Sequence, residues 1–156
     1  MNDTVSMERV FKASIAKVWA MWTTPDGLGK WYWPGAMTGR VLHMDVRVGG
    51  TYEIAADGMP FTSRGTYTEV VAPTRLASIA EIDFIEGVSP YQRRDLVVLS
   101  EVAGGTRMIF TATRLHSEEW QARSEAGLRD TFEKLAALLE GRPLPPVPDC
   151  ALAGPK

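Results

Sequence analysis

The sequence contains a single cysteine, Cys150, so it can form neither an intrachain disulfide nor a cysteine-based metal cluster. The fold must therefore be held by packing. Long apolar runs are missing as well: no stretch approaches the roughly 20 residues that cross a bilayer, and the N-terminus lacks the apolar core of a secretion signal. We therefore expect a cytoplasmic protein with no membrane insertion.

An excess of charge of one sign is also missing. The chain has 17 basic and 19 acidic residues, which gives a formal net charge of -2 and provides no broad cationic field for nucleic-acid phosphates. We expect no nucleic-acid partner. A hydrophobic content of 45% in 156 residues is typical of one globular domain with one core.

Motifs for metal, nucleotide or nucleophilic chemistry are absent from the sequence. The only two histidines, His43 and His116, lack the spacing of metal ligands, and no glycine-rich phosphate loop, dinucleotide fingerprint or nucleophile elbow occurs. We expect no metal and no cofactor, and no residue can be assigned as catalytic. His116 is expected to be a capping or exposed residue before the last helix.

Several polar residues fall on expected strands, where a shift of one residue decides between interior and solvent. Glu81 and Asp83 could share one face as a pair of carboxylates for acid-base chemistry. Arg93 or Arg94 could meet a ligand carboxylate. A solvated strand face is the commoner explanation for all four, and the sequence leaves the inward or outward direction of His43, Glu81 and Arg94 open.

The N-terminal part of the chain alternates and then becomes helical. Residues 4–12 have the alternation of a strand. Ser14 is a good N-cap for a short amphipathic helix. Thr24 followed by Pro25 then starts a second short helix that should run to about residue 30. The aromatic segment over residues 31–35 is expected to form a packed turn.

The middle of the chain alternates between apolar strands and turn residues, with Gly49-Gly50, Asp57-Gly58 and Gly104-Gly105 as the clearest turns. No helical pattern separates these strands, so antiparallel pairing is expected. The expected strands cover residues 4–12, 40–46, 51–56, 61–71, 75–84, 93–102 and 106–114. We therefore predict an α+β fold with a seven-stranded antiparallel sheet that curls around its apolar face.

The longest helical pattern starts at Ser117 and is ended by Gly141 and Pro143. The proline-rich residues 142–156 have no periodicity, so we predict one domain over residues 1–141 followed by a tail. On a helical wheel, the stripe expected to face the sheet contains Trp120, Ser124, Gly127, Leu128, Thr131, Phe132, Leu135, Leu138 and Leu139. The residues expected mostly opposite are Arg129, Asp130, Glu133, Lys134 and Glu140.

The middle of this stripe is small and partly polar, with Ser124, Gly127 and Thr131. A glycine inside a helix costs about 1 kcal/mol relative to alanine, so a compensating reason is expected. Either the helix approaches the sheet closely at this point, or the gap is one wall of a cavity whose floor is the sheet. The two explanations are not exclusive.

Six spaced segments resemble one family. They are residues 11–19 (FKASIAKVW), 22–31 (WTTPDGLGKW), 46–50 (VRVGG), 65–70 (GTYTEV), 104–108 (GGTRM) and 127–135 (GLRDTFEKL). In this order, over about residues 4–141, the chain resembles the AHSA family, the homologues of the activator of heat-shock protein 90 ATPase, within the START, polyketide-cyclase and birch-pollen-allergen-like superfamily (SRPBCC). The resemblance implies a helix-grip fold, in which a strand, two small helices, six further strands and a long helix enclose a cavity.

The resemblance also implies binding of hydrophobic ligands, with catalysis in some relatives such as aromatase/cyclases. We therefore expect a small hydrophobic molecule as the partner. Two alternatives stay open: a cofactor-independent cyclase or dehydratase, which needs an inward titratable group with a shifted pKa, and a chaperone or regulator interaction module, which needs an exposed apolar patch and a filled interior. Chaperone activation is not expected, because the chain starts directly at the first strand of the resembling domain. A homodimer is left open.

The expected cavity has three groups of lining residues. Trp31 and Trp33 could cover one end and Trp120 the other, because large rigid rings pack and stack well. The long helix would contribute Ser124, Gly127, Leu128 and Thr131. The sheet would contribute Met44, Tyr52, Phe61, Tyr67, Met108 and Phe110, each of which could equally belong to an ordinary core.

Overall fold

The computed structural model of the protein describes residues 4–33, 37–60, 62–83, 87, 89–113 and 118–143, without the side chains of residues 118–121, 123 and 124. Several sequence predictions therefore lie outside the described residues. They concern Phe61, His116, Ser117, the end of the aromatic segment at residues 34–35, the tail from residue 144, and the side chains of Trp120 and Ser124.

Within the described part of the chain, seven strands form one antiparallel sheet in the order β1-β7-β6-β5-β4-β3-β2. The strands are β1 (Thr4–Phe11), β2 (Gly39–Met44), β3 (Thr51–Ala56), β4 (Thr62–Val71), β5 (Arg75–Ile82), β6 (Tyr91–Val102) and β7 (Gly105–Thr113). The first and last strands are neighbours, and every other pair is sequential. The predicted α+β fold with a seven-stranded antiparallel sheet is confirmed.

Local features of the strands explain their turns, their ends and the curl of the sheet. The predicted turns at Gly49, Gly58 and Gly104 have φ angles of 84°, 77° and 81°, which glycine adopts without strain. β-bulges in β2 and β4 bend these two strands. β6 begins two residues before the predicted start, because Tyr91 pairs with Ile82 at the end of β5.

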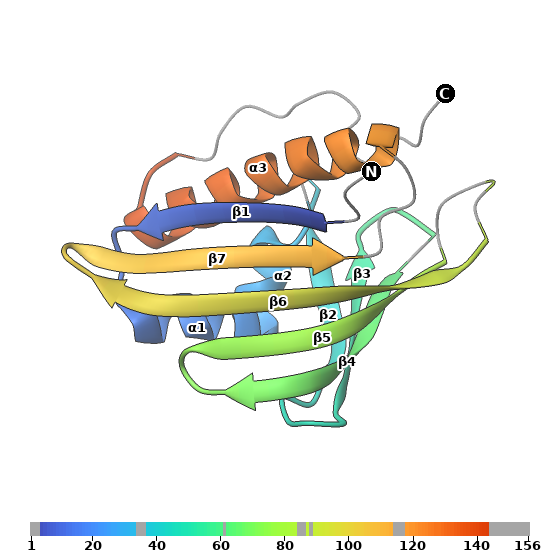
Figure 1. Ribbon diagram of the computed structural model, residues 1–156, viewed down its shortest axis with the longest axis horizontal. Helices are drawn as coiled ribbons and strands as arrows, with labels where there is room; N and C mark the ends of the chain where they lie inside the picture. Colours follow the sequence, from blue (N-terminus) through green and yellow to red (C-terminus); the bar gives the residue numbers. More distant parts are fainter. Residues whose placement is uncertain are drawn as a thin grey trace.

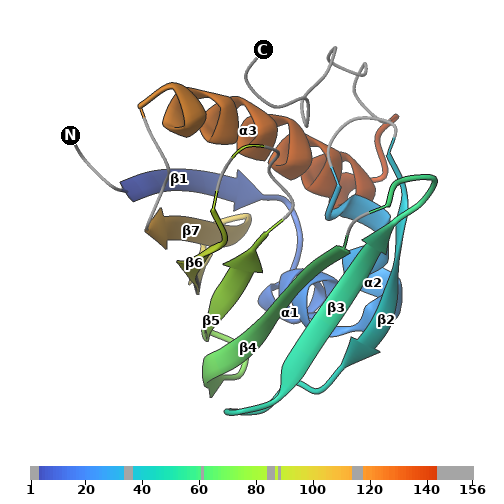
Figure 2. The same cartoon turned by 90° about the vertical axis from the view of Figure 1, so that its right-hand side faces the viewer.

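Three described helices lie on the concave side of the sheet: α1 (Ile15–Thr23), α2 (Pro25–Trp31) and α3 (Glu118–Glu140). Figure 1 shows α3 running alongside β1, with α1 and α2 behind the sheet. In Figure 2 the sheet curves from β1 round to β2, and α3 spans the opening between them. The long helix therefore faces the inner surface of the sheet.

Thr24 ends α1 and begins α2. Its hydroxyl donates to the carbonyl oxygen of Ala20 at 2.7 Å and accepts from the backbone N–H of Gly27 at 3.1 Å. Pro25 follows at the first position of α2, where the missing N–H has no helical partner to lose. The capping role predicted from the sequence is therefore seen in the structure.

We predict that Thr24→Ala lowers the free energy of unfolding by about 1 kcal/mol, because it removes the side-chain cap of α2. Urea unfolding would measure this loss. Thr24→Ser keeps the hydroxyl and should remain close to the wild type. Equal unfolding midpoints for the wild type and the alanine variant would contradict the capping role.

Aromatic rings fill the core between α1, α2, α3 and β7. The ring centroids of Trp22 and Trp31 are 4.6 Å apart, and those of Phe110 and Phe132 are 5.5 Å apart. Trp22 also stacks on Phe110 at 6.1 Å. The core predicted for the first helix is thus joined to the sheet and to α3 by direct ring contacts.

Candidate functional site

The strand register brings two rows of side chains to the concave face. One row runs across β3, β4, β5 and β6 and contains Tyr52, Gly65, Ala80 and Arg93. The neighbouring row runs across β4, β5, β6 and β7 and contains Tyr67, Ser78, Asp95 and Ala112. The rings of Tyr52 and Tyr67 pack at 5.3 Å, as expected for side chains on one face.

Four polar side chains, here named the polar cluster, meet at this face: Ser63, Arg93 and Asp95 from the sheet and Tyr32 from the end of α2. The Nε and Nη2 atoms of Arg93 donate to the two carboxylate oxygens of Asp95 at 2.7 and 2.8 Å. The hydroxyl of Tyr32 lies 2.6 Å from Oγ of Ser63 and also hydrogen-bonds with Arg93. The polar cluster therefore connects the end of α2 with β4 and β6.

The charged pair of the polar cluster is desolvated. Burial lowers the pKa of Arg93, but the neighbouring Asp95 carboxylate more than offsets this effect, so the pKa is raised overall. The guanidinium therefore stays protonated at every physiological pH. The side chains of Arg93 and Asp95 nevertheless keep 25% and 13% of their surface accessible.

Three tyrosines beside this pair are kept neutral by burial. Burial is the largest cause that raises the pKa of Tyr32, Tyr52 and Tyr67. Tyr52 crosses over Gly65, where an added Cβ would lie 2.6 Å from its hydroxyl oxygen. This crossing lets the Tyr52 hydroxyl reach Ser78 on β5, with which it hydrogen-bonds.

We predict that these three phenols stay protonated in the folded protein well above the ordinary tyrosine pKa of about 10. Because their folded-state pKa is raised, their contribution to stability is complete below about pH 10 and is lost as the pH rises further. Tyrosinate absorbance during an alkaline titration would test this. At most one of the 4 tyrosines should ionise near the ordinary pKa in the native protein, whereas all should do so in guanidinium chloride. Ionisation of all of them without unfolding would contradict the described burial.

The inner stripe of α3 contains open space at Gly127. Gly127 is itself half-buried and lies one and two turns before Thr131 and Leu135, which are 6% and 0% exposed, so it belongs to the side of α3 that carries these buried residues. Among the described residues outside its own helix backbone, no atom lies within 4 Å of a Cβ built at Gly127. The sequence-based alternative that α3 approaches the sheet closely at this point is therefore wrong.

The other predicted lining residues occupy different parts of the interior. Trp31 and Trp33 are buried, and their indole N–H groups donate to the carbonyl oxygens of Met21 and Ala55 at 2.8 and 3.0 Å. Met108 and Phe110 lie on β7 near the aromatic core. Met44 and Leu128 are half-buried. The structure thus brings Tyr52 and Tyr67 together and places the β7 pair in another part of the same concave face, beside the aromatic core.

The structure determines which polar residues of the strands point inward and which point outward. Arg93 faces inward, whereas Arg94 is exposed. His43 is exposed and hydrogen-bonds with Thr51 at 3.1 Å. Glu81 accepts from Gln92 at 2.8 Å, and Asp83 pairs with Arg64. The two carboxylates therefore have separate partners on the outer surface and form no acid-base pair.

Lys134 is a buried residue that the sequence analysis placed on the wrong side of α3. Only 4% of it is exposed, and its ammonium group donates to the carbonyl oxygens of Trp33 and Met37 at 3.1 and 2.7 Å. Burial lowers the pKa of Lys134. A long aliphatic stem that ends in hydrogen-bond donors can be buried where backbone carbonyls accept from it. No periodicity in the helix sequence could show these carbonyls.

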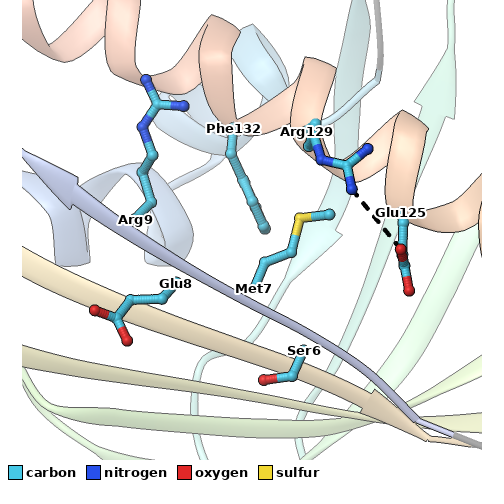
Figure 3. A pocket seen from close by; sticks show the side chains of 7 residues that line it. All are labelled: Ser6, Met7, Glu8, Arg9, Glu125, Arg129 and Phe132. Atoms are coloured by element: carbon cyan, nitrogen blue, oxygen red, sulfur yellow. Dashed lines mark ion pairs between the residues drawn. The ribbon is translucent and has the colours of Figure 1, made fainter. Parts of the chain in front are cut away.

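A separate groove of about 350 Å³ opens between β1 and α3. Figure 3 shows Met7 and Phe132 pointing toward each other across it, with Arg129 paired to Glu125 at its side. The described residues that line it are Ser6, Met7, Glu8, Arg9, Glu125, Arg129 and Phe132. Four charged side chains make this groove a poor match for an apolar molecule, and the sequence analysis did not predict it.

The described residues contain neither a metal-binding cluster nor a membrane-spanning helix. There, no group of three or more His, Cys, Asp and Glu side chains is placed to hold a metal ion. No helix in the described ranges is long and apolar enough to cross a membrane.

A curved seven-stranded antiparallel sheet with two short helices and a long C-terminal helix on its concave side defines a helix-grip protein. Proteins of this fold commonly bind hydrophobic ligands. The chain belongs to the family described as Activator of Hsp90 ATPase homolog 1-like protein, which it matches over residues 12–140.

Solved structures agree with this assignment. Protein CV1439 from Chromobacterium violaceum is 26% identical, with a TM-score of 0.80 and coverage of 90% of this chain and 99% of that chain. A protein from Arthrobacter aurescens is 26% identical, with a TM-score of 0.73 and coverage of 97% and 90%. The Aha1 dimer from Colwellia psychrerythraea is 21% identical, with a TM-score of 0.72 and coverage of 88% and 96%, and shows likeness of fold alone. No curated protein matches the chain.

Proposed function

We propose that the protein binds a small, largely apolar molecule between the concave face of the sheet and α3, without a cofactor. The open space at Gly127 is the observation that carries this proposal. A glycine inside a helix costs about 1 kcal/mol relative to alanine. Because no described side chain needs the room, we infer that the space is kept for a ligand.

The accessible surface of the polar cluster supports binding on the concave face of the sheet. Arg93 points inward and its charge is desolvated by the surrounding protein, yet a quarter of its side chain, 25%, remains accessible. Tyr32 is likewise desolvated and only half-buried. A side chain that is surrounded by protein and still accessible to solvent borders a recess in the protein. Tyr52 and Tyr67 add apolar ring surface beside it.

Binding explains the titratable groups on the concave face of the sheet better than catalysis does. A general acid or base works best when its pKa lies near the working pH. Burial raises the pKa of Tyr32, Tyr52 and Tyr67 away from neutrality, and the pKa of Arg93 is raised as well. These groups are suited to donating fixed hydrogen bonds, whereas the cyclase alternative needs a group that exchanges protons.

A protein-interaction module is also less well supported. Such a module needs a contiguous exposed apolar patch. Among the described residues, the large apolar side chains that are exposed are Val10, Leu42, Val48, Met59 and Val71. They lie on β1, on β2, in the turn after β2, in the β3–β4 turn and at the end of β4, so they are distributed over the molecule rather than gathered on one element.

Filling the space at Gly127 tests the proposal. We predict that Gly127→Leu keeps the fold but weakens binding of the apolar probe N-phenyl-1-naphthylamine at least about tenfold, because its side chain occupies the ligand space. Gly127→Ala should be more stable by about 1 kcal/mol through helix propensity. Probe fluorescence and thermal unfolding would measure the two effects.

Ala126→Leu is the matched control, because Ala126 is the exposed neighbour of Gly127 on α3. This control should bind the probe as the wild type does. Unchanged probe affinity in folded Gly127→Leu, or no probe binding to the wild type, would contradict the proposed function.

A further inference from the structure

We propose that the polar cluster recognises an uncharged oxygen acceptor on the ligand, which makes the ligand a largely apolar carbonyl compound such as a ketone or quinone. This inference rests on the proposed function and adds the chemical class of the ligand. It concerns Tyr32, Ser63, Arg93 and Asp95.

The hydrogen bonds of the polar cluster leave donors available. A guanidinium carries five N–H groups in a planar fork, more than Asp95 and Tyr32 together accept. Asp95 takes Nε and Nη2 through both of its oxygens. Because Arg93 can only donate, Tyr32 accepts from it and keeps its own proton for Ser63, at 2.6 Å, or for a ligand. The cluster therefore offers N–H and O–H donors to an acceptor in the recess.

The charges of the polar cluster cancel. Arg93 and Asp95 form a bidentate pair, and the neighbouring tyrosines are neutral. A ligand carboxylate would bring a second negative charge to a desolvated position beside Asp95, at the cost of its own hydration. A carbonyl oxygen accepts the same hydrogen bonds and buries no charge. The sequence-based hypothesis was that Arg93 meets a ligand carboxylate. Because Asp95 already supplies the counter-charge, we expect Arg93 to meet a carbonyl oxygen instead.

Two aromatic rings and a methyl group lie beside the polar cluster, and they favour apolar surface on the rest of the ligand. Tyr52 and Tyr67 present their rings on the same face, and Ala80 lies between Arg93 and Gly65 in the first row. A few oriented donors in a mostly apolar site fix the orientation of a ligand and provide specificity. We therefore expect flat, mostly hydrocarbon molecules with one carbonyl oxygen.

Two sets of matched probes of different size test this inference. The larger set is fluorenone, fluorene and fluorene-9-carboxylate. The smaller set is 1-indanone, indane and indane-1-carboxylate. For the set of probes that the protein binds, the wild type should bind the ketone at least about tenfold tighter than the hydrocarbon. A hydrogen bond from a charged donor provides a gain of this size. The carboxylate should bind more weakly than the ketone. Infrared spectra should show the bound carbonyl stretch at lower frequency than in a hydrocarbon solvent.

Two variants assign these effects. The double variant Arg93→Met with Asp95→Leu removes both charges at similar volume, and should lose the ketone preference and the infrared shift while it still binds the hydrocarbon. Tyr32→Phe removes one hydroxyl and should reduce both effects. Equal affinity of the wild type for ketone and hydrocarbon, or tightest binding of the carboxylate, would overturn this inference and leave the proposed function standing. Binding of no probe would overturn the proposed function, and the inference with it.

Discussion

Asp95→Ala is expected to lower the free energy of unfolding by about 3 to 5 kcal/mol, because it leaves the desolvated guanidinium of Arg93 without its counter-charge. In the folded protein, both side chains are less than a third exposed, at 25% and 13%, so solvent screens the pair only in part. Guanidinium chloride unfolding followed by tryptophan fluorescence would measure the loss.

The double variant Arg93→Met with Asp95→Leu is the control for this effect. It removes the pair together, and should recover much of the lost stability because no charge remains unpaired. The pair would not be desolvated as described if the free energy of unfolding of Asp95→Ala lay within about 1 kcal/mol of the wild-type value. The same conclusion would follow if the double variant were no more stable than Asp95→Ala.

Phe132→Ala is expected to lower the free energy of unfolding by about 3 to 5 kcal/mol, because it removes a buried ring from the aromatic core. Phe132 is 2% exposed and lies within 5.5 Å of the Phe110 centroid and 6.3 Å of the Trp22 centroid. Near-ultraviolet circular dichroism and chemical unfolding would report the loss of packing and of stability.

Phe132→Leu is the matched control for this variant. It keeps most of the buried apolar volume and should cost clearly less than the alanine substitution. The ring contacts would be of little energetic importance if the alanine variant unfolded at nearly the same denaturant concentration as the wild type.

The parts of the fold that the sequence predicted are those determined by neighbouring residues. Ser14 and Thr24 cap helices through bonds to backbone groups three residues ahead, so the local sequence is sufficient. The turns at Gly58 and Gly104 depend on a positive φ angle, which their own residue type favours. Alternation and turns together were enough for the strands, and the order of strands and helices agreed with the family resemblance.

The parts that the sequence could not predict depend on contacts between distant elements. Arg93 and Arg94 are adjacent, and only the pairing of Ala80 with Arg93 decides which of them faces inward. Lys134 is buried because carbonyl groups 97 and 101 residues away accept its hydrogen bonds. The polar cluster likewise joins Tyr32, Ser63 and Arg93 from three elements, and no local pattern marks such a meeting.

Gly127 shows how far the candidate site could be predicted. The helical spacing placed it on one stripe with Thr131 and Leu135, which are buried, whereas Gly127 itself is half-buried. The spacing could not decide between close packing and open space, since both favour a small residue. The absence of any described neighbour within 4 Å of the added Cβ decided against close packing.

Anomalous diffraction from crystals soaked with 2-bromofluorene would test the central claim, that an apolar molecule binds inside the fold, most directly. The bromine should appear between α3 at Gly127 and the concave face of strands β4 to β6, and should be absent from the same site in Gly127→Leu. Bromine found only in the groove between Met7 and Phe132, or on the outer surface of the sheet, would contradict the account.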